Sequence, residues 1–408
     1  MEAIAAKGEG VGSRLRCLVL PATVALLASA CTGGDGDEGR DGARGKIQVT
    51  VHFQGALTGD FDYLVTHAYQ AARLRFDELN GDEGFPAVVT LEQADTQGDR
   101  GRAPAVAQGV VDDPNTVAVI GPAFAGESEE SGGIYNEARI PFVTPSATTP
   151  ELADRGWDYW YRTVANDDDQ GGPLGEWIAS RYSGIYVAHD QSSYGQGLAE
   201  VVADVAQESG ASVEKVEGIV PTEVYSTLIG DVEASGAEAL FYGGYDIQTG
   251  QIVAQARDAG LDLPIYSGDG SVSTILLDLA GDTGTDVFLS CPCNLEGEGD
   301  FLSKYEAEYG ETRVPIFAAE GYDAASLVGE GIRSAIEGGA ETPTAIREGI
   351  KTYLDSLTVD APFSGVAKQI AFDDAGELAA QDRRALIFFY SVEPGQISLE
   401  GSASEVLG

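Results

Sequence analysis

Basic residues, histidine, methionine and cysteine are all scarce in this chain of 408 residues. The 24 Lys and Arg residues face 66 Asp and Glu residues, so the formal net charge at pH 7 is −42. A surface of this charge repels phosphate backbones and anionic lipids, which excludes nucleic acid as an expected partner. The three histidines, His52, His67 and His189, are scattered, and no H-E-x-x-H or paired C-x-x-C spacing occurs, so no metal site is expected.

Signatures of common enzymes are missing as well. The turn at 54–59, after the first predicted strand, does not fit the G-x-G-x-x-G pattern of dinucleotide-binding folds. The chain has no G-x-x-x-x-G-K phosphate loop and no G-x-S-x-G nucleophile elbow. We therefore expect a protein that is not an enzyme and has no cofactor. The hydrophobic fraction of 43% is that of a globular chain, and the length predicts two or three domains at about 150 residues each.

The N-terminal segment 1–30 has the composition of an export signal. Three basic residues precede an apolar stretch at 17–27, and small residues follow it. The stretch is about 11 residues long, well short of the roughly 20 that span a bilayer. Residues 27–31, Leu-Ala-Ser-Ala-Cys, resemble the lipobox of bacterial lipoproteins, with Ala28 where Leu is usual. The resemblance implies lipidation of Cys31; the alternative is a soluble secreted protein in which this cysteine is incidental.

A polar, glycine-rich run at 31–45 follows the signal. It has almost nothing to bury, so it predicts a flexible tether, and the folded part is expected to begin at Lys46. We therefore expect the protein to be exported and anchored by lipid alone to the bacterial cell membrane, on its extracellular or periplasmic face. Because the acidity belongs to the exported part, salt should weaken its self-repulsion.

Short β-rich apolar runs alternate with longer amphipathic segments, which predicts an α/β fold of parallel sheets with crossover helices. The first series has predicted strands at 47–53, 88–91, 117–120 and 141–143, with helices at 63–79, 103–111 and 128–138. The second has strands at 184–188, 211–216, 239–242, 264–267 and 287–290, with helices at 174–182, 197–209, 227–235, 247–259 and 274–279. The last third has helices at 301–309, 318–337 and 344–354 and strands at 367–372 and 385–390. Two similar α/β lobes are implied.

Several local strings occur together in the chain, at 55–61, 119–122, 134–138, 144–152, 189–197, 242–245 and 267–270. In these strings the chain resembles the branched-chain amino-acid binding proteins of ABC importers. The resemblance implies a type I periplasmic binding protein, in which two doubly wound parallel-sheet lobes close on a ligand like a Venus flytrap. We expect lobe 1 at 46–164 plus 292–358 and lobe 2 at 165–291 plus 359–408.

Ligand contacts are expected where strands end at the cleft. The segment Ser146-Ala147-Thr148 comes before a Pro-Glu helix start, whose hydroxyls and N–H groups could hold a carboxylate or simply cap the helix. Asp269 lies between two glycines after a strand, either as a solvent turn or as a partner for an ammonium group. The resemblance places Ser146 and Thr148 at ligand-contacting positions and an acidic residue at position 269 on the ligand's α-amino group.

Four aromatic residues complete the expected cleft, namely Tyr63, Tyr194, Tyr245 and Phe317. One position departs from the family, because counting along from Gly121 gives Ala125 where those amino-acid binders place a serine. Its N–H group could still contact the ligand and Ser128 lies three residues on, or else the ligand is not an α-amino acid.

The remaining cysteines, Cys291 and Cys293, are separated by one proline. In an oxidising compartment they would pair if the chain turns tightly there; free thiols and a metal site are the alternatives.

The expected function is capture of a small molecule, foremost a branched-chain or other hydrophobic amino acid, for delivery by a monomer to an ABC permease. The alternatives are a binding protein for an amide, urea or aromatic acid, and a ligand sensor for a signalling partner.

Overall fold

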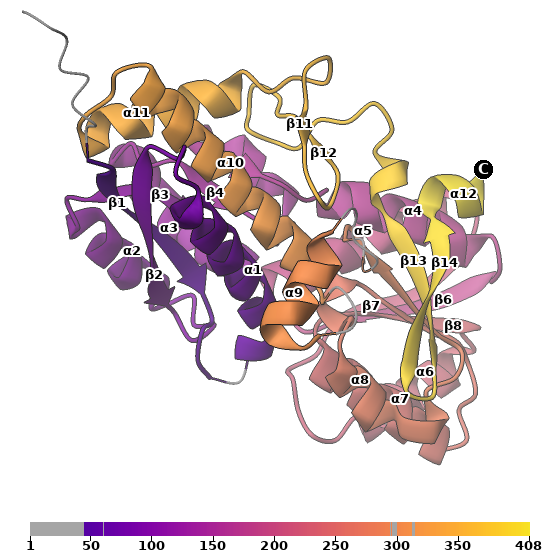
Figure 1. Cartoon of the computed structure of the whole chain (residues 1–408). Coiled ribbons are helices and arrows are strands. Elements are labelled where there is room, and N and C mark those ends of the chain that lie inside the picture. Colours follow the sequence, from indigo (N-terminus) through magenta and orange to yellow (C-terminus); the bar gives the residue numbers. More distant parts are fainter. Residues whose placement is uncertain (1–44, 60, 294, 296–299, 312–314) are drawn as a thin grey trace, which may run out of the picture. The chain divides into compact units, whose positions relative to one another are not determined.

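Two sheets, each with helices on both faces, make up most of the computed structural model (Figure 1). The structure describes residues 45–408 except 60, 294, 296–299 and 312–314. The predicted signal and Cys31 lie outside the described residues, as does nearly all of the predicted tether. Within the described part, no helix is long and apolar enough to cross a membrane.

Sheet A has five parallel strands in the order β2-β1-β3-β4-β5. They are β1 (Ile47–Gly55), β2 (Ala87–Asp95), β3 (Thr116–Ile120), β4 (Phe142–Thr144) and β5 (Trp160–Arg162). All of β3, β4 and β5 is buried, as expected for parallel strands covered on both faces. Its helices are α1 (Asp62–Gly81), α2 (Ala103–Asp112), α3 (Ala125–Glu137), α10 (Ala318–Glu337) and α11 (Pro343–Asp355). Sheet A and these helices are called lobe A.

Sheet B has seven strands in the order β14-β13-β10-β9-β8-β6-β7, and β13 and β14 are antiparallel to their neighbours. The strands are β6 (Gly184–His189), β7 (Ser212–Gly218), β8 (Ala239–Gly243), β9 (Ile265–Ser267), β10 (Val287–Cys291), β13 (Phe388–Glu393) and β14 (Gln396–Ser402). The helices are α4 (Asp167–Ala179), α5 (Ser193–Glu208), α6 (Ser226–Ser235), α7 (Asp246–Asp258), α8 (Thr274–Ala280) and α12 (Ala403–Leu407). Sheet B and these helices are called lobe B.

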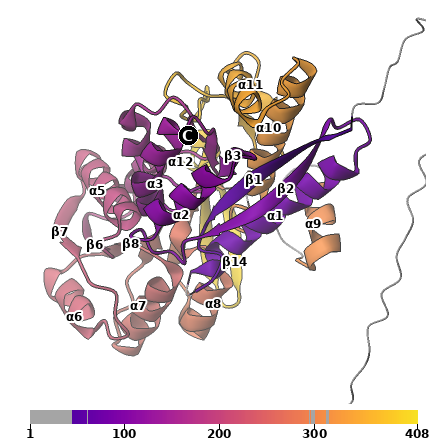
Figure 2. The same ribbon diagram turned by 90° about the vertical axis from the view of Figure 1, so that its left-hand side faces the viewer.

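The helices cover the sheets in separate groups. In lobe A, α1 packs against α10 and α10 against α11, while α2 packs against α3. In lobe B, α4 packs against α5, and α7 packs against both α6 and α8. The turned view shows α6, α7 and α8 gathered away from α10 and α11 (Figure 2). The two-lobed α/β architecture predicted from the sequence is confirmed.

The secondary-structure prediction is wrong in several places, and β5, β14 and α12 were not predicted at all. Helix α4 begins at Asp167, seven residues before the predicted start, because Asn166 caps it through the N–H of Asp169 although Pro173 interrupts the apolar pattern. The predicted strand at 367–372 contributes only β12 (Gln369–Ile370), paired with β11 (Phe363–Ser364). The predicted strand at 385–390 begins as a 3₁₀ turn, and β13 starts at Phe388.

The chain passes between the lobes three times. It does so after β5, after β10, and between α11 and β13. Helix α9 (Phe301–Tyr309) follows the second passage and contacts α1. The residue boundaries of lobes 1 and 2 given above stay a prediction.

Candidate functional site

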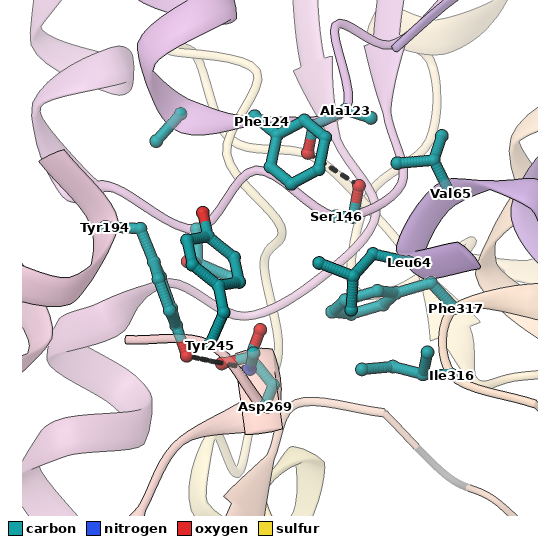
Figure 3. Close-up of a pocket in the computed structure, with 13 residues that line it drawn as sticks. Leu64, Val65, Ala123, Phe124, Ser146, Tyr194, Tyr245, Asp269, Ile316 and Phe317 are labelled. Atoms are coloured by element: carbon teal, nitrogen blue, oxygen red, sulfur yellow. Dashed lines mark hydrogen bonds between the residues drawn. The ribbon is translucent and has the colours of Figure 1, made fainter. Parts of the chain in front are cut away.

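A cavity of about 40 Å³ lies where the two lobes meet (Figure 3). Seven of the nine predicted ligand contacts line it, namely Ala125, Ser146, Thr148, Tyr194, Tyr245, Asp269 and Phe317. Leu64, Val65, Ala123, Phe124, Gly270 and Ile316 complete the lining. The segments that contribute these residues follow strands of both sheets, as expected for an α/β cleft. A larger hollow of about 380 Å³ shares Phe124, Ala125, Tyr194 and Tyr245 with it.

Asp269 supplies the only charged side chain among the described residues of this lining. It begins the turn after β9 and accepts a hydrogen bond from Tyr194 Oη at 2.9 Å. The N–H of Gly270 donates to the same phenol oxygen at 2.9 Å, and a Cβ at Gly270 would lie 2.8 Å from the Gly244 carbonyl oxygen. Only glycine therefore allows this close approach. Burial raises the pKa of Asp269 to about 6, against the hydrogen bonds from Gln170 and Tyr194.

A second carboxylate, Asp167, was missed by sequence reasoning. It is the first residue of α4 and 0% exposed, and neither of its oxygens has a hydrogen-bond partner among the described residues. Burial and then the charge of Asp269 raise its pKa well above the usual range, although the nearby Thr148 hydroxyl opposes the shift. The repulsion between these two buried carboxyl groups favours a cation near them. The signal was the Asn-Asp-Asp-Asp run at 166–169, which is typical of a helix start.

Hydrogen bonds from Arg162 fix the backbone on either side of Thr148. Arg162 donates to the carbonyl oxygens of Ala147 at 3.2 Å and Thr149 at 2.8 Å, on either side of Thr148, and it pairs with Glu377. Thr148 lines the cavity, whereas Ala147 does not. The helix start predicted here is a 3₁₀ helix, Pro150–Arg155, and its N-cap residue Thr149 makes no side-chain cap hydrogen bond. Simple helix capping therefore does not explain the hydroxyls of this segment.

Two further hydroxyl groups already donate hydrogen bonds to backbone carbonyl oxygens of the protein. Ser146 Oγ donates to the Ala123 carbonyl oxygen at 2.8 Å (Figure 3), so it can offer a ligand only its acceptor capacity. Ser128 Oγ donates to the Pro122 carbonyl oxygen at 3.1 Å and therefore does not replace the hydroxyl that Ala125 lacks. Ala125 is the first residue of α3, whose N-cap residue Phe124 has no side-chain cap. Backbone N–H groups at this helix start are thus the donors that remain.

Tyr63 does not line the cavity. Its hydroxyl donates to the Asp246 carboxylate at the start of α7, and Asp246 also accepts from Ser273. Because α1 belongs to lobe A and α7 to lobe B, this hydrogen bond joins the lobes. Arg100 Nη1 and Ser193 Oγ, 3.4 Å apart, make a second such contact. The structure is therefore that of a closed cleft.

Aromatic and aliphatic side chains surround the polar groups. The ring centroids of Tyr194 and Tyr245 are 5.5 Å apart. The ring centroid of Tyr245 also lies 5.7 Å from that of Phe61 and 6.1 Å from that of Phe124. Opposite the Tyr194–Asp269 pair, Leu64, Ile316 and Phe317 form an apolar wall (Figure 3). Sequence reasoning missed Phe61 and Phe124; their place just after strands β1 and β3 was the available signal.

Cys291 and Cys293 form a disulfide with Cα atoms 5.0 Å apart, at the end of β10 and outside the cavity lining. In the described part of the chain, no group of His, Cys, Asp and Glu side chains is arranged to hold a metal ion.

Residues 48–383 match the family model described as periplasmic binding protein. The chain is 28% identical over 337 residues to the leucine-, isoleucine-, valine-, threonine- and alanine-binding protein of Pseudomonas aeruginosa, covering 81% of this chain and 87% of that one. It is 30% identical over 252 residues to the Leu/Ile/Val-binding protein of Escherichia coli strain K12, covering 61% and 68%.

Solved structures of similar fold include the branched-chain amino acid transporter substrate binding protein LivJ from Streptococcus pneumoniae, in complex with isoleucine. Its TM-score is 0.74 at 22% identity, and the match covers 86% of this chain and 99% of that one. The leucine binding protein LivK from Thermotoga maritima has a TM-score of 0.73 at 20% identity, covering 86% and 98%.

Proposed function

The chain belongs to the periplasmic binding protein family, and from that premise we propose that its cleft captures an amino acid with an apolar side chain. Members of this family are substrate-binding proteins rather than enzymes. The relatives that bind leucine, isoleucine and valine by name support the same ligand class for this chain. The proposed role is capture and release, with no bond made or broken.

One observation carries the proposal, which is that an apolar wall faces the buried carboxylate of Asp269 across a small cavity. Asp269 lines the cavity, and Asp167 is a second buried carboxyl group, near enough for the charge of Asp269 to raise its pKa. An ammonium group would neutralise the charge of Asp269 and supply the cationic partner that this carboxylate lacks in the cavity lining. The wall of Leu64, Ile316 and Phe317 suits an aliphatic side chain.

The ligand's carboxylate is proposed to lie between Thr148 and the start of α3. Thr148 offers a hydroxyl donor, and the first N–H groups of α3 have no intrahelical partner. Ala125, Ser146, Tyr194, Tyr245 and Phe317 are proposed as further contacts. Ala147 and Tyr63 are proposed to act indirectly, the first through the backbone beside Thr148 and the second by joining the lobes.

We further propose that the protein works as a lipid-anchored monomer outside the cytoplasm and delivers its ligand to an ABC permease. The lipobox-like residues ending at Cys31 and the glycine-rich tether support the anchor. The family of periplasmic binding proteins and the transporter context of its relatives support the permease as partner.

A second candidate is an amide, urea or aromatic acid as ligand, because Ala125 supplies no hydroxyl for an α-carboxylate. Calorimetry on the exported chain carrying Cys31→Ser separates the candidates. We expect L-leucine, L-isoleucine or L-valine to bind, and N-acetyl-L-leucine and 4-methylpentanoate, which lack the ammonium group, to bind far more weakly. Equal binding of leucine and 4-methylpentanoate, or binding of an amide alone, would contradict the proposal.

A further inference from the structure

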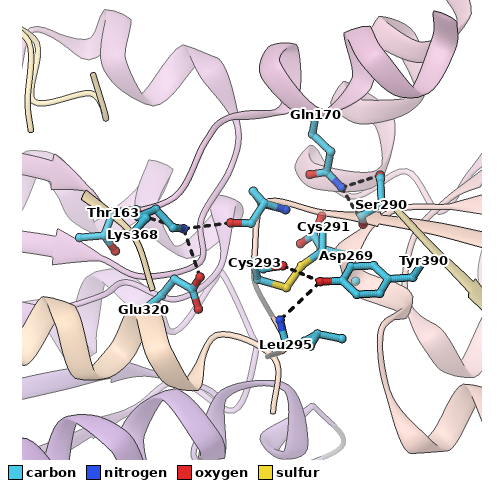
Figure 4. The surroundings of a disulfide bond; sticks show 12 residues. Thr163, Gln170, Asp269, Ser290, Cys291, Cys293, Leu295, Glu320, Lys368 and Tyr390 are labelled. Atoms are coloured by element: carbon cyan, nitrogen blue, oxygen red, sulfur yellow. Dashed lines mark hydrogen bonds and ion pairs between the residues drawn. A yellow bond between two sulfur atoms is a disulfide. The ribbon is translucent and has the colours of Figure 1, made fainter. Parts of the chain in front are cut away.

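The side chain of Lys368 lies where all three passages between the lobes meet (Figure 4). Lys368 belongs to the third passage, between α11 and β13. Its ammonium group donates to the Pro292 carbonyl oxygen at 3.0 Å and to the Thr163 carbonyl oxygen at 3.4 Å. Pro292 follows β10 in the second passage, and Thr163 follows β5 in the first. One cation therefore connects three segments that are far apart in sequence.

The same ammonium group is paired with Glu320 at 3.1 Å. Lys368 is 8% exposed and Glu320, in the first turn of α10, is 1% exposed, so the pair is shielded from water. Nearby, Asp323 accepts hydrogen bonds from the N–H groups of Val366 and Ala367 at 2.7 and 2.9 Å. These bonds fix the backbone that presents Lys368, so the position of its ammonium group is set by α10.

The second passage is fixed on both sides of Pro292. The disulfide joins Cys291 to Cys293, and Tyr390 Oη donates to the Cys293 carbonyl oxygen at 2.9 Å (Figure 4). Just before it, Ser290 Oγ accepts from Gln170 Nε2 at 3.0 Å, and Gln170 lies near enough to Asp269 to lower the pKa of that carboxyl group. Gln170 thus links the surroundings of the cavity carboxylate to the segment whose carbonyl group Lys368 holds.

We propose that Lys368 is a positioning residue that fixes the angle between the lobes in the closed form. The inference rests on the proposed function, in which the lobes close on a ligand. When the lobes rotate, the first two passages turn relative to each other, and a single ammonium group can hold both carbonyl oxygens only over a narrow range of angles. The hydrogen bonds present in this closed structure therefore favour closure over an open form that lacks them.

Three variants test this role. Lys368→Met removes the hydrogen bonds to the Thr163 and Pro292 carbonyl oxygens but leaves Glu320 buried without its cation. This variant should therefore have a strongly lowered melting temperature. The double variant Lys368→Met with Glu320→Met removes both charges, and replacing a buried pair by apolar groups should restore most of the stability. Lys304→Met is the control, because Lys304 pairs with side chains, Glu78 of α1 at 3.2 Å and Asp300 at the start of α9 at 3.3 Å, and not with the carbonyl oxygens that Lys368 holds.

The decisive readouts come from the double variant. We expect its ligand-free radius of gyration, measured by small-angle X-ray scattering, to exceed that of the wild type, and its affinity for L-leucine to be at least about tenfold lower. The control should match the wild type in both measurements. If stability returns and the radius and affinity return with it, Lys368 has only a structural role and the inference is wrong. If the wild type does not bind leucine, the proposed ligand class is wrong. The ligand-free radius of gyration still tests whether Lys368 fixes the angle between the lobes.

Discussion

Tyr194 donates a hydrogen bond of 2.9 Å to Asp269, a residue 75 positions away that follows a different strand of sheet B. The bond orients the carboxylate at the cavity, but a phenol carries no positive charge, so the charge of Asp269 is not neutralised. Asp167 lies close enough for the charge of Asp269 to raise its pKa. The carboxylate of Asp269 therefore stays without a cationic partner in the cavity lining until a cationic ligand binds.

Replacing Asp167 should move stability and affinity in opposite directions. Asp167→Asn replaces a buried carboxyl group that has no hydrogen-bond partner among the described residues and that burial and the charge of Asp269 disfavour, so the ligand-free melting temperature should rise. The affinity for L-leucine should fall, because one of two carboxylates near the ammonium group is lost. Asp168→Asn is the matched control, since Asp168 lies in the same helical turn and is exposed. An unchanged affinity in Asp167→Asn would exclude Asp167 from the site.

Acid should also separate stability from affinity. Burial raises the pKa of Asp269 to about 6 and those of Glu127 and Asp323 to about 7. As the pH falls, the native protein therefore binds protons at these groups before the unfolded chain does, because the same groups bind protons in the unfolded chain only near pH 4. The ligand-free protein should therefore become more stable as the pH falls from about 8 to about 5. Leucine affinity should fall over the lower part of that range, because an ammonium group must displace the proton of Asp269. Thermal melting and calorimetry across this range check both trends, and parallel trends would contradict the account.

The proposed lipid anchor makes a simple prediction. Cys31→Ser should release the protein from the membrane fraction of the producing bacterium while the leucine affinity of the purified protein stays unchanged. Serine lacks the thiol to which the lipid would be attached, so the variant has no acyl chains to insert into the membrane. Retention of the variant in the membrane fraction would overturn the lipoprotein proposal.

The net charge of −42 predicts that salt stabilises the fold. Added salt shortens the range over which carboxylates repel one another, so the melting temperature should rise from low salt into the molar range of NaCl. A flat or falling melting temperature would mean that ion pairs such as Arg100 with Glu129 and Glu130 already compensate the surface locally.

The architecture could be predicted from the sequence because its buried parallel strands are continuous apolar runs. The run Thr116–Ile120 is buried at every position, and its neighbours are of the same kind. The strand Trp160–Arg162 was not predicted because it is three residues long and ends in a buried arginine, whose charge is paired with Glu377. That pairing spans 215 positions, so local patterns cannot show it.

The candidate site was predictable only where side chains follow strand ends in sequence. Thr148, Tyr245 and Asp269 do so, and they line one cavity. Asp167 and Lys368 could not be found in this way, because their roles depend on partners from distant segments. Tyr63 also follows a strand end in sequence, but it does not line the cavity, because its hydroxyl donates to Asp246 across the cleft.

Leucine calorimetry on Asp269→Asn and Thr148→Val, beside the wild type and the exposed control Asp282→Asn, decides whether the ligand is held through its ammonium group. We expect a loss of roughly 1.5–3 kcal/mol for Asp269→Asn, about ten- to more than a hundredfold in affinity, because a charge-assisted hydrogen bond is removed. Thr148→Val should cost less, since backbone N–H groups still hold the carboxylate. A loss at Thr148 with none at Asp269 would contradict capture of an amino acid through its ammonium group.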